Sequence, residues 1–258
     1  MSVIKLLGNA SNHHEDGLAD PLARFAIVLA ALVHDVDHCG LPNTQLNIEK
    51  SDVAVKYNGL SVAEQNSLDV TWNLLMKDAY KEFRRALYST TQDLVRFRSL
   101  LVHAVLVTDI VNKDLQSQRK ARWERVFGSV ADAEGPKASP NERGTALLEL
   151  VIQASDVSHT MQHWHTYRQW NESLFHEMMV AWKEGRAEKD PRENWYEGEI
   201  GFFKFYILPL AERVKYSSAF GALGAELYHC AQSNLEEWEM KGKGIVDELA
   251  KKYSENGW

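Results

Sequence analysis

Cysteine is scarce in this chain: the 258 residues include only Cys39 and Cys230, and neither belongs to a CxxC or a Cys/His finger pattern. This excludes a disulfide framework and is typical of a reducing, cytoplasmic compartment. Proline is also rare, with six residues. Long segments of the chain therefore contain no strong helix breaker.

Long hydrophobic runs and basic clusters are missing as well. The longest apolar stretch, residues 25–33, is far shorter than the roughly 20 residues that a membrane-spanning helix needs, and no secretory leader is visible at the start. The formal net charge is -7, and no window combines Lys or Arg with stacking aromatics. We therefore expect no membrane contact from this segment and no nucleic-acid partner. A homodimer and membrane-anchoring segments upstream of Met1 remain open.

Apolar residues recur at intervals of three and four, which predicts an all-α multi-helix bundle. The hydrophobic fraction of 45% is enough for the core of one domain over 1–258. Gly, Pro and Ser gather at 131–144, the clearest loop, and the apolar rhythm directly after Met1 predicts a helix that begins further upstream. The expected helices are 22–38, 61–78, 80–88, 91–113, 116–128, 143–157, 161–184, 193–213 and 224–251.

The segment HDVDH, His34 to His38, follows the apolar run FAIVLAALV. An unpaired charge is costly to bury in such a setting, and a metal ion would balance it. Helical spacing places His34 and His38 on one face, four residues apart. A further carboxylate, Asp156, ends the aliphatic segment LLELVIQASD. An imidazole with two carboxylates suits zinc, and a carboxylate that also bridges outward suits a harder second ion, magnesium or manganese.

Five motifs now follow one another in order: HDVDHCGLPN, the YN of VKYNGLSVAEQN, the TD of LVTDI, SDVSHTMQHWHTYRQW and GEIGFFKFYILPL. In order and spacing they resemble the catalytic domain of class I 3',5'-cyclic nucleotide phosphodiesterases over about residues 20–215. The resemblance implies an HD-type helical fold and two divalent ions. It also implies hydrolysis of cAMP or cGMP to the 5'-monophosphate, with departure of the 3'-oxygen, in cyclic nucleotide signalling.

The resemblance also implies residue roles at the ions. His34, Asp35 and Asp156 match zinc ligands, and Asp35 bridges to the second ion. The remaining residues around the ions match groups that hold the bridging hydroxide or the waters of the second ion: His38, Glu64 and Thr108, with Asp109 beside them. For the purine, Phe202 and Leu174 match the apolar pair that sandwiches the base, and Tyr167 and Trp170 shape the wall of that pocket.

Two departures from the family pattern stand out. Glu199 occupies the position of a family glutamine, three residues before Phe202. A carboxylate only accepts hydrogen bonds, which favours guanine, whereas a protonated carboxyl would mimic the amide. The family also carries a histidine motif of the HNxxH type roughly 35 residues before HDVDH. We expect that segment, with the remaining zinc ligand and the leaving-group acid, before Met1, because His13 and His14 lie too close to HDVDH.

Alternative interpretations remain open for several residues. His38 is also placed to cap a helix end, and Ser61 with Glu64 fits a capping box. Thr108 and Asp109 are compatible with purely structural roles, and His159, His163 and His165 fit no zinc motif well. At the level of function, the alternative is a catalytically impaired remnant that binds a nucleotide or a partner. A phosphohydrolase acting on deoxynucleotides or alarmones is disfavoured by the YRQW and GF motifs.

Overall fold

The computed structural model describes residues 3–10, 20–128 and 139–255. All regular structure in these ranges is helical and none is strand, which confirms the all-α prediction. The chain divides into two compact units, Ser2–Asp156 and Val157–Trp258, which are described separately below. Within the described ranges, no helix has both the length and the apolar character that crossing a bilayer requires.

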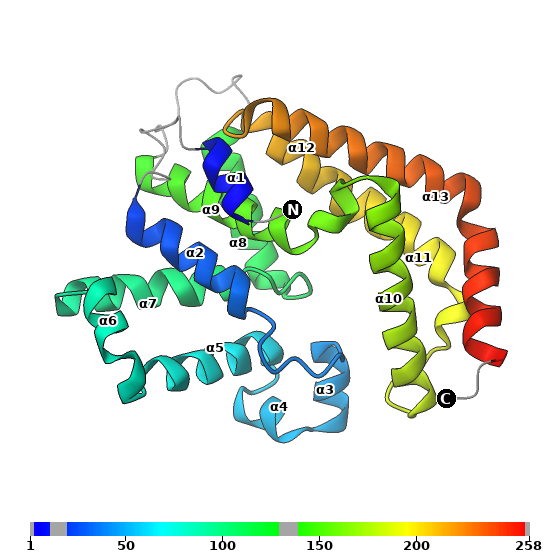
Figure 1. Cartoon of the computed structure of the whole chain (residues 1–258), viewed down its shortest axis with the longest axis horizontal. Helices are drawn as coiled ribbons and strands as arrows, with labels where there is room; N and C mark the ends of the chain where they lie inside the picture. Colours follow the sequence, from blue (N-terminus) through cyan, green and yellow to red (C-terminus); the bar gives the residue numbers. More distant parts are fainter. Residues whose placement is uncertain (1–2, 11–19, 129–138, 256–258) are drawn as a thin grey trace. The chain divides into compact units, whose positions relative to one another are not determined.

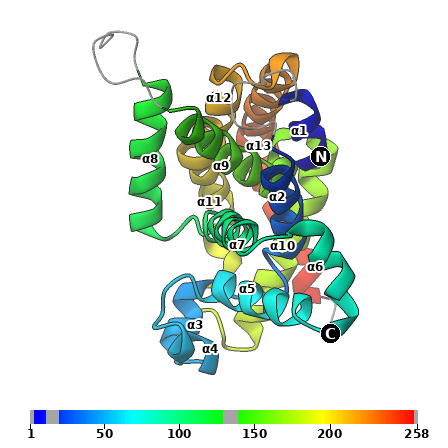
Figure 2. The ribbon, with the colours of Figure 1, turned by 90° about the vertical axis from the view of Figure 1, so that its left-hand side faces the viewer.

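In the first unit, α2 packs along α7, and α9 packs against α1, α2, α7 and α8 (Figures 1 and 2). The buried face of α2 is built largely from small residues, Ala23, Ala26 and Ala30, which allow neighbouring helices to approach closely. The helices of this unit are α1 Val3–Ala10, α2 Pro21–Val33, α3 Asn43–Glu49, α4 Asp52–Lys56, α5 Val62–Leu75, α6 Lys81–Leu87, α7 Thr91–Leu106, α8 Lys113–Phe127 and α9 Pro140–Asp156.

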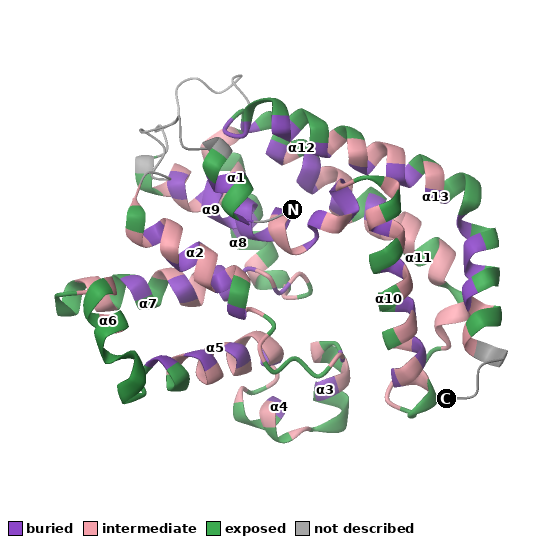
Figure 3. Ribbon diagram, in the orientation of Figure 1, coloured by how far each residue is buried: buried purple, intermediate pink, exposed green. Residues whose placement is uncertain are grey.

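In the second unit, the long helix α13 packs against α10, α11 and α12. Buried and exposed positions alternate along it, as Figure 3 shows, so that one face of α13 joins a core containing Trp238, Phe175 and Phe203. The elements are α10 Trp164–Lys183, α11 Trp195–Phe202, a π-helical turn Phe203–Ile207, α12 Leu208–Tyr216 and α13 Gly221–Glu255.

Several predicted boundaries are wrong. The helix expected at 22–38 ends at Val33, and the one expected at 91–113 ends at Leu106. The helix expected at 193–213 is interrupted by the π-helical turn. Residues 140–144 of the expected loop are already helical, whereas 129–138 and both His13 and His14 lie outside the described residues. The short helices α3 and α4 were not expected.

Candidate metal centre and base-contacting residues

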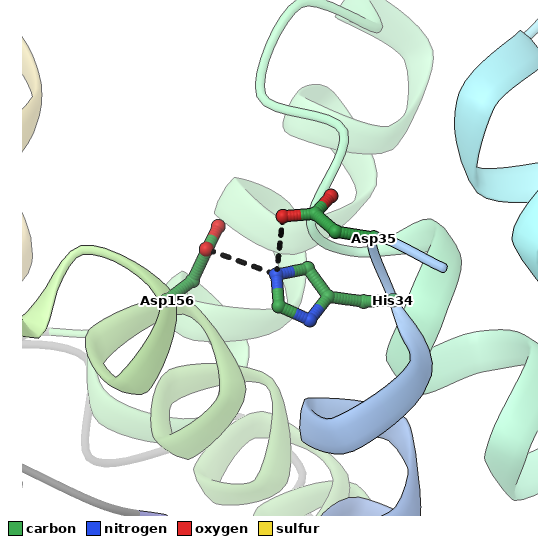
Figure 4. A group of neighbouring side chains, drawn as sticks. All are labelled: His34, Asp35 and Asp156. Carbon is green, nitrogen blue, oxygen red and sulfur yellow. Dashed lines mark hydrogen bonds and ion pairs between the residues drawn. The ribbon is translucent and has the colours of Figure 1, made fainter. Parts of the chain in front are cut away.

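His34 stands at the end of α2 with its ring between two carboxylates. Its backbone N–H donates to the carbonyl oxygen of Ala30 at 2.8 Å, and Nδ1 lies 3.2 Å from the carbonyl oxygen of Ala31. That oxygen can only accept, so Nδ1 carries a hydrogen. Nε2 lies 3.1 Å from Asp156 Oδ1 and 3.2 Å from Asp35 Oδ2 (Figure 4).

These three side chains fit a divalent cation. One ligand atom from each lies within 4.8 Å of the others, and a nitrogen with two carboxylate oxygens is a donor set that zinc accepts. Burial by itself lowers the pKa of His34, but the hydrogen bonds and charges of Asp156 and Asp35 outweigh it and raise that pKa to about 10. The hydrogen bond with His34 in turn lowers the pKa of Asp35. Positive charge is therefore favoured between the carboxylates of Asp35 and Asp156.

The two carboxylates differ in exposure. The Asp35 side chain is 66% exposed, against 29% for Asp156. Asp156 ends α9, where Leu150, Val151 and Ile152 are buried, and this anchors its backbone. Of the two, Asp35 is the carboxylate whose oxygens are more open to solvent.

His38 does not share a helical face with His34, and that prediction is wrong. After Val33 the chain makes hydrogen-bonded turns, from Val36 N to Val33 O at 3.1 Å and from His38 N to Asp35 O at 3.0 Å. Asp37 then takes the left-handed conformation, with φ of 65°, which a continuing helix does not allow. His38 is exposed, and its Nδ1 accepts from Gly40 N at 3.1 Å.

Glu64 lies in the first turn of α5, where Asn43 holds it. Asn43 Nδ2 donates to Glu64 Oε2 at 2.9 Å, and Asn43 Oδ1 accepts from Ala63 N at 2.9 Å. The expected capping box is therefore wrong: Ser61 makes no side-chain cap bond, and a residue from another helix caps α5. Burial raises the pKa of Glu64, and the bond from Asn43 partly offsets this.

Thr108 and Asp109 both make structural contacts. Thr108 Oγ1 donates to the carbonyl oxygen of Val105 at 2.7 Å. The buried Asp109 accepts from Ser61 Oγ at 2.7 Å and from the backbone N–H groups of Val111 and Asn112 at 2.9 and 3.1 Å. Asp109 therefore joins the start of α5 to the end of α7, and its charge contributes to the raised pKa of Glu64.

In the second unit, Glu199 is held by donors. Tyr167 donates its hydroxyl hydrogen to Glu199 Oε2 at 2.6 Å, and Asn171 provides a second hydrogen bond. Burial raises the pKa of Glu199, although these bonds act in the opposite direction. Tyr167 is 1% exposed, so its ring belongs to the core, and we expect it to act on a ligand only through Glu199.

The remaining base-contacting candidates lie at the surface of the second unit. Leu174 and Trp170 on α10 are 44% and 59% exposed, and Phe202 is half-buried and stacks on Tyr206 with ring centroids 5.5 Å apart. His159 packs against Trp170, and His163 caps α10 by accepting from His165 N at 3.3 Å. Among the described residues, none of these histidines joins a group that could hold a metal.

Sequence reasoning did not place Asn43 against Glu64, and it missed Asn66 and Ser67, which contact the turn after α2. The available signal was the polar run EQNS at the start of a helix, with Glu64 and Ser67 three residues apart.

Comparison with known proteins gives a consistent result. The family model described as 3'5'-cyclic nucleotide phosphodiesterase matches residues 2–219. A probable 3',5'-cyclic-AMP phosphodiesterase from Caenorhabditis elegans is 29% identical over 72% of this chain, and a dual specificity calcium/calmodulin-dependent 3',5'-cyclic nucleotide phosphodiesterase 1C from Mus musculus is 27% identical over 72%. The chain covers only 28% and 25% of these relatives.

Solved structures show the same fold. The phosphodiesterase domain of the RhoPDE fusion protein from the choanoflagellate Salpingoeca rosetta matches with a TM-score of 0.69 at 20% identity, over 96% of this chain and 78% of that one. A second structure of the rhodopsin phosphodiesterase domain from Salpingoeca rosetta matches with a TM-score of 0.70 at 19% identity, over 97% and 76%. With the family model matching most of its length, the chain belongs to the 3',5'-cyclic nucleotide phosphodiesterase family.

Proposed function

We propose that this chain hydrolyses purine 3',5'-cyclic nucleotides to 5'-monophosphates, with two divalent ions, and so acts in cyclic nucleotide signalling. The observation that carries the proposal is the convergence of His34, Asp35 and Asp156, from two distant segments, within 4.8 Å. The family supports the reaction type, and the names of the relatives support cyclic nucleotides as the substrate class.

Each residue near the centre has a defined task. When bound, zinc with magnesium or manganese supplies Lewis-acid activation of water and of the phosphoryl group. The hydrogen bond from His34 Nδ1 to Ala31 leaves Nε2 as the ligand atom and fixes the orientation of the ring. Asp156 would hold the zinc together with His34, and the exposed Asp35 would be available to a second ion as well. The groups expected around that second ion are His38, Glu64, Thr108 and Asp109.

The test of this proposal combines metal analysis with turnover. We expect the purified chain to hold zinc near stoichiometry and to hydrolyse cAMP or cGMP, and Asp156→Asn to lose most of both. Asp114→Asn, an exposed carboxylate on α8, is the matched control and should change neither. Nucleotide binding without turnover by the unaltered chain would contradict the proposal and identify a catalytically impaired binding module instead.

Glu199 sets the base preference in this proposal. Tyr167 and Asn171 both donate to it, so the ionised carboxylate has only acceptor positions left for a base. Guanine presents two adjacent donors, N1–H and N2–H, whereas adenine presents one amino group beside acceptors. With Phe202 and Leu174 on the two faces of the purine, the ionised carboxylate favours guanine, and a protonated carboxyl restores the donor that adenine N1 needs.

This preference is tested by the ratio of kcat/KM for cGMP to that for cAMP. We expect the ratio to fall in Glu199→Gln, and in the unaltered chain to rise with increasing pH as the carboxyl group, whose pKa is raised by burial, ionises. Glu197→Gln, an exposed change on the same helix, should leave the ratio as it is. Equal ratios in Glu199→Gln and the unaltered chain would contradict this role.

A further inference from the structure

The turn after α2, residues 34–38, is the least regular part of the candidate metal centre. It follows the last residue of α2, carries two of the three ligands, and contains the left-handed Asp37 with φ of 65°. Asp tolerates this conformation better than most non-glycine residues, but it still costs free energy that the surrounding contacts must offset. Two backbone hydrogen bonds, from Val36 N and from His38 N, close the turn from within.

Contacts from α5 hold this turn from outside. Ser67 Oγ donates to the carbonyl oxygen of Val36 at 2.8 Å, and Asn66 Nδ2 donates to Asp37 Oδ2 at 2.9 Å. Ser67 is fully buried, with 0% exposure, so water cannot replace its hydroxyl group once it is removed. One bond holds the peptide carbonyl group directly before the left-handed Asp37, and the other holds the side chain of Asp37 itself.

The start of α5 is itself fixed to the first unit. Ser61, with φ of 40°, donates to the buried Asp109 at 2.7 Å, and Asn112 Nδ2 donates to Ser61 Oγ at 3.2 Å. Asn43 adds the cap at Ala63. Asn66 and Ser67 therefore act on the turn from a helix whose first turn cannot slide or fray freely.

We infer that Asn66 and Ser67 are positioning residues for the metal ligands, an inference that rests on the proposed metal centre. Neither residue supplies one of the three candidate ligand atoms. Each holds the Val36–Asp37 segment, which sets the direction in which the adjacent Asp35 carboxylate points. Among the described residues, that carboxylate pairs with His34 Nε2 at 3.2 Å, and its side chain is mostly exposed. Without the two bonds from α5, the turn relaxes and Asp35 no longer stays on the shared ion.

The test is the zinc affinity of the whole chain, measured by competition with a chromophoric chelator. We expect Ser67→Ala and Asn66→Ala each to bind zinc about tenfold more weakly, the lower end of the effect known for residues that orient metal ligands. Ser99→Ala on α7 and Asn73→Ala on α5, both exposed, should bind like the unaltered chain. Thermal melting in EDTA shows which variants remain folded.

An exchange of donor and acceptor separates positioning from general destabilisation. Asn66→Asp places a second carboxylate against Asp37 and should weaken zinc binding more than Asn66→Ala. Combining it with Asp37→Asn restores one donor and one acceptor, and asparagine tolerates the left-handed conformation, so affinity should recover. Unchanged affinity in the single variants, or no recovery in the double variant, overturns the inference. A lack of zinc binding in the unaltered chain overturns the proposed function, and this inference with it.

Discussion

Glu199 is a carboxylate in a largely apolar part of α11, and burial raises its pKa above the ordinary 4.5. A raised pKa in the folded state means that the folded chain keeps the proton to higher pH than the unfolded chain does. The ionised group therefore costs stability, and this cost appears as the pH rises above 4.5 and is complete above the pKa of the folded state.

The resulting prediction concerns Glu199→Gln. The amide still accepts from the Tyr167 hydroxyl group but carries no charge, so we expect this variant to melt at a higher temperature than the unaltered chain at pH 7.5. The gain should shrink toward zero at pH 4.5. Thermal unfolding at the two pH values measures it, with Glu197→Gln as the exposed control. A gain that does not depend on pH would refute the explanation by burial.

At the scale of elements, the long helices were predictable because their apolar positions repeat every three or four residues over several turns. The helices α3 and α4, with seven and five residues, are too short for such a repeat. The π-helical turn Phe203–Ile207 precedes Pro209, which has no N–H to donate to the preceding turn. Hydropathy alone gave no sign of that change.

The candidate ligands were predictable from their motifs, but their support was not. His34, Asp35 and Asp156 stand out because ionisable residues end apolar segments. The left-handed Asp37 and the bond from Ser67 to a backbone carbonyl oxygen leave no pattern in the sequence. The same holds for the cap of α5, because Asn43 lies 20 residues before Ala63, whose N–H it caps.

This long-range cap gives a prediction for α5. Asn43→Ala removes the acceptor for Ala63 N and the donor to Glu64, and we expect it to lower the free energy of unfolding by about 1–2 kcal/mol. Asn43→Asp keeps the acceptor for Ala63 N but places a like charge against Glu64. It should therefore lose less free energy of unfolding than Asn43→Ala only at acidic pH, where the two carboxyl groups are not both ionised. Urea unfolding measures these changes. Asn73→Ala should leave the free energy of unfolding almost unchanged. If Asn43→Ala changed it as little as Asn73→Ala does, the cap would be ruled out.

At the scale of the whole molecule, the three candidate ligands all belong to the first unit, Ser2–Asp156. A bound ion joins the end of α2 to the end of α9 and should stabilise that unit by about 2.7 kcal/mol at a concentration 100 times its Kd. Hydrogen exchange in zinc and in EDTA measures this. Zinc should increase protection in 20–38 and 143–156, with little change in 221–255, whereas protection confined to 221–255 would place the ion elsewhere.

His34 and Asp156 are 122 residues apart in the chain, and this separation sets the order of events during synthesis. A nascent chain carries the imidazole and the first carboxylate early, but the ribosome must add more than a hundred further residues before the third ligand exists. Capture of a cation by all three candidate ligands would therefore have to wait until α9 has been made and has reached the end of α2.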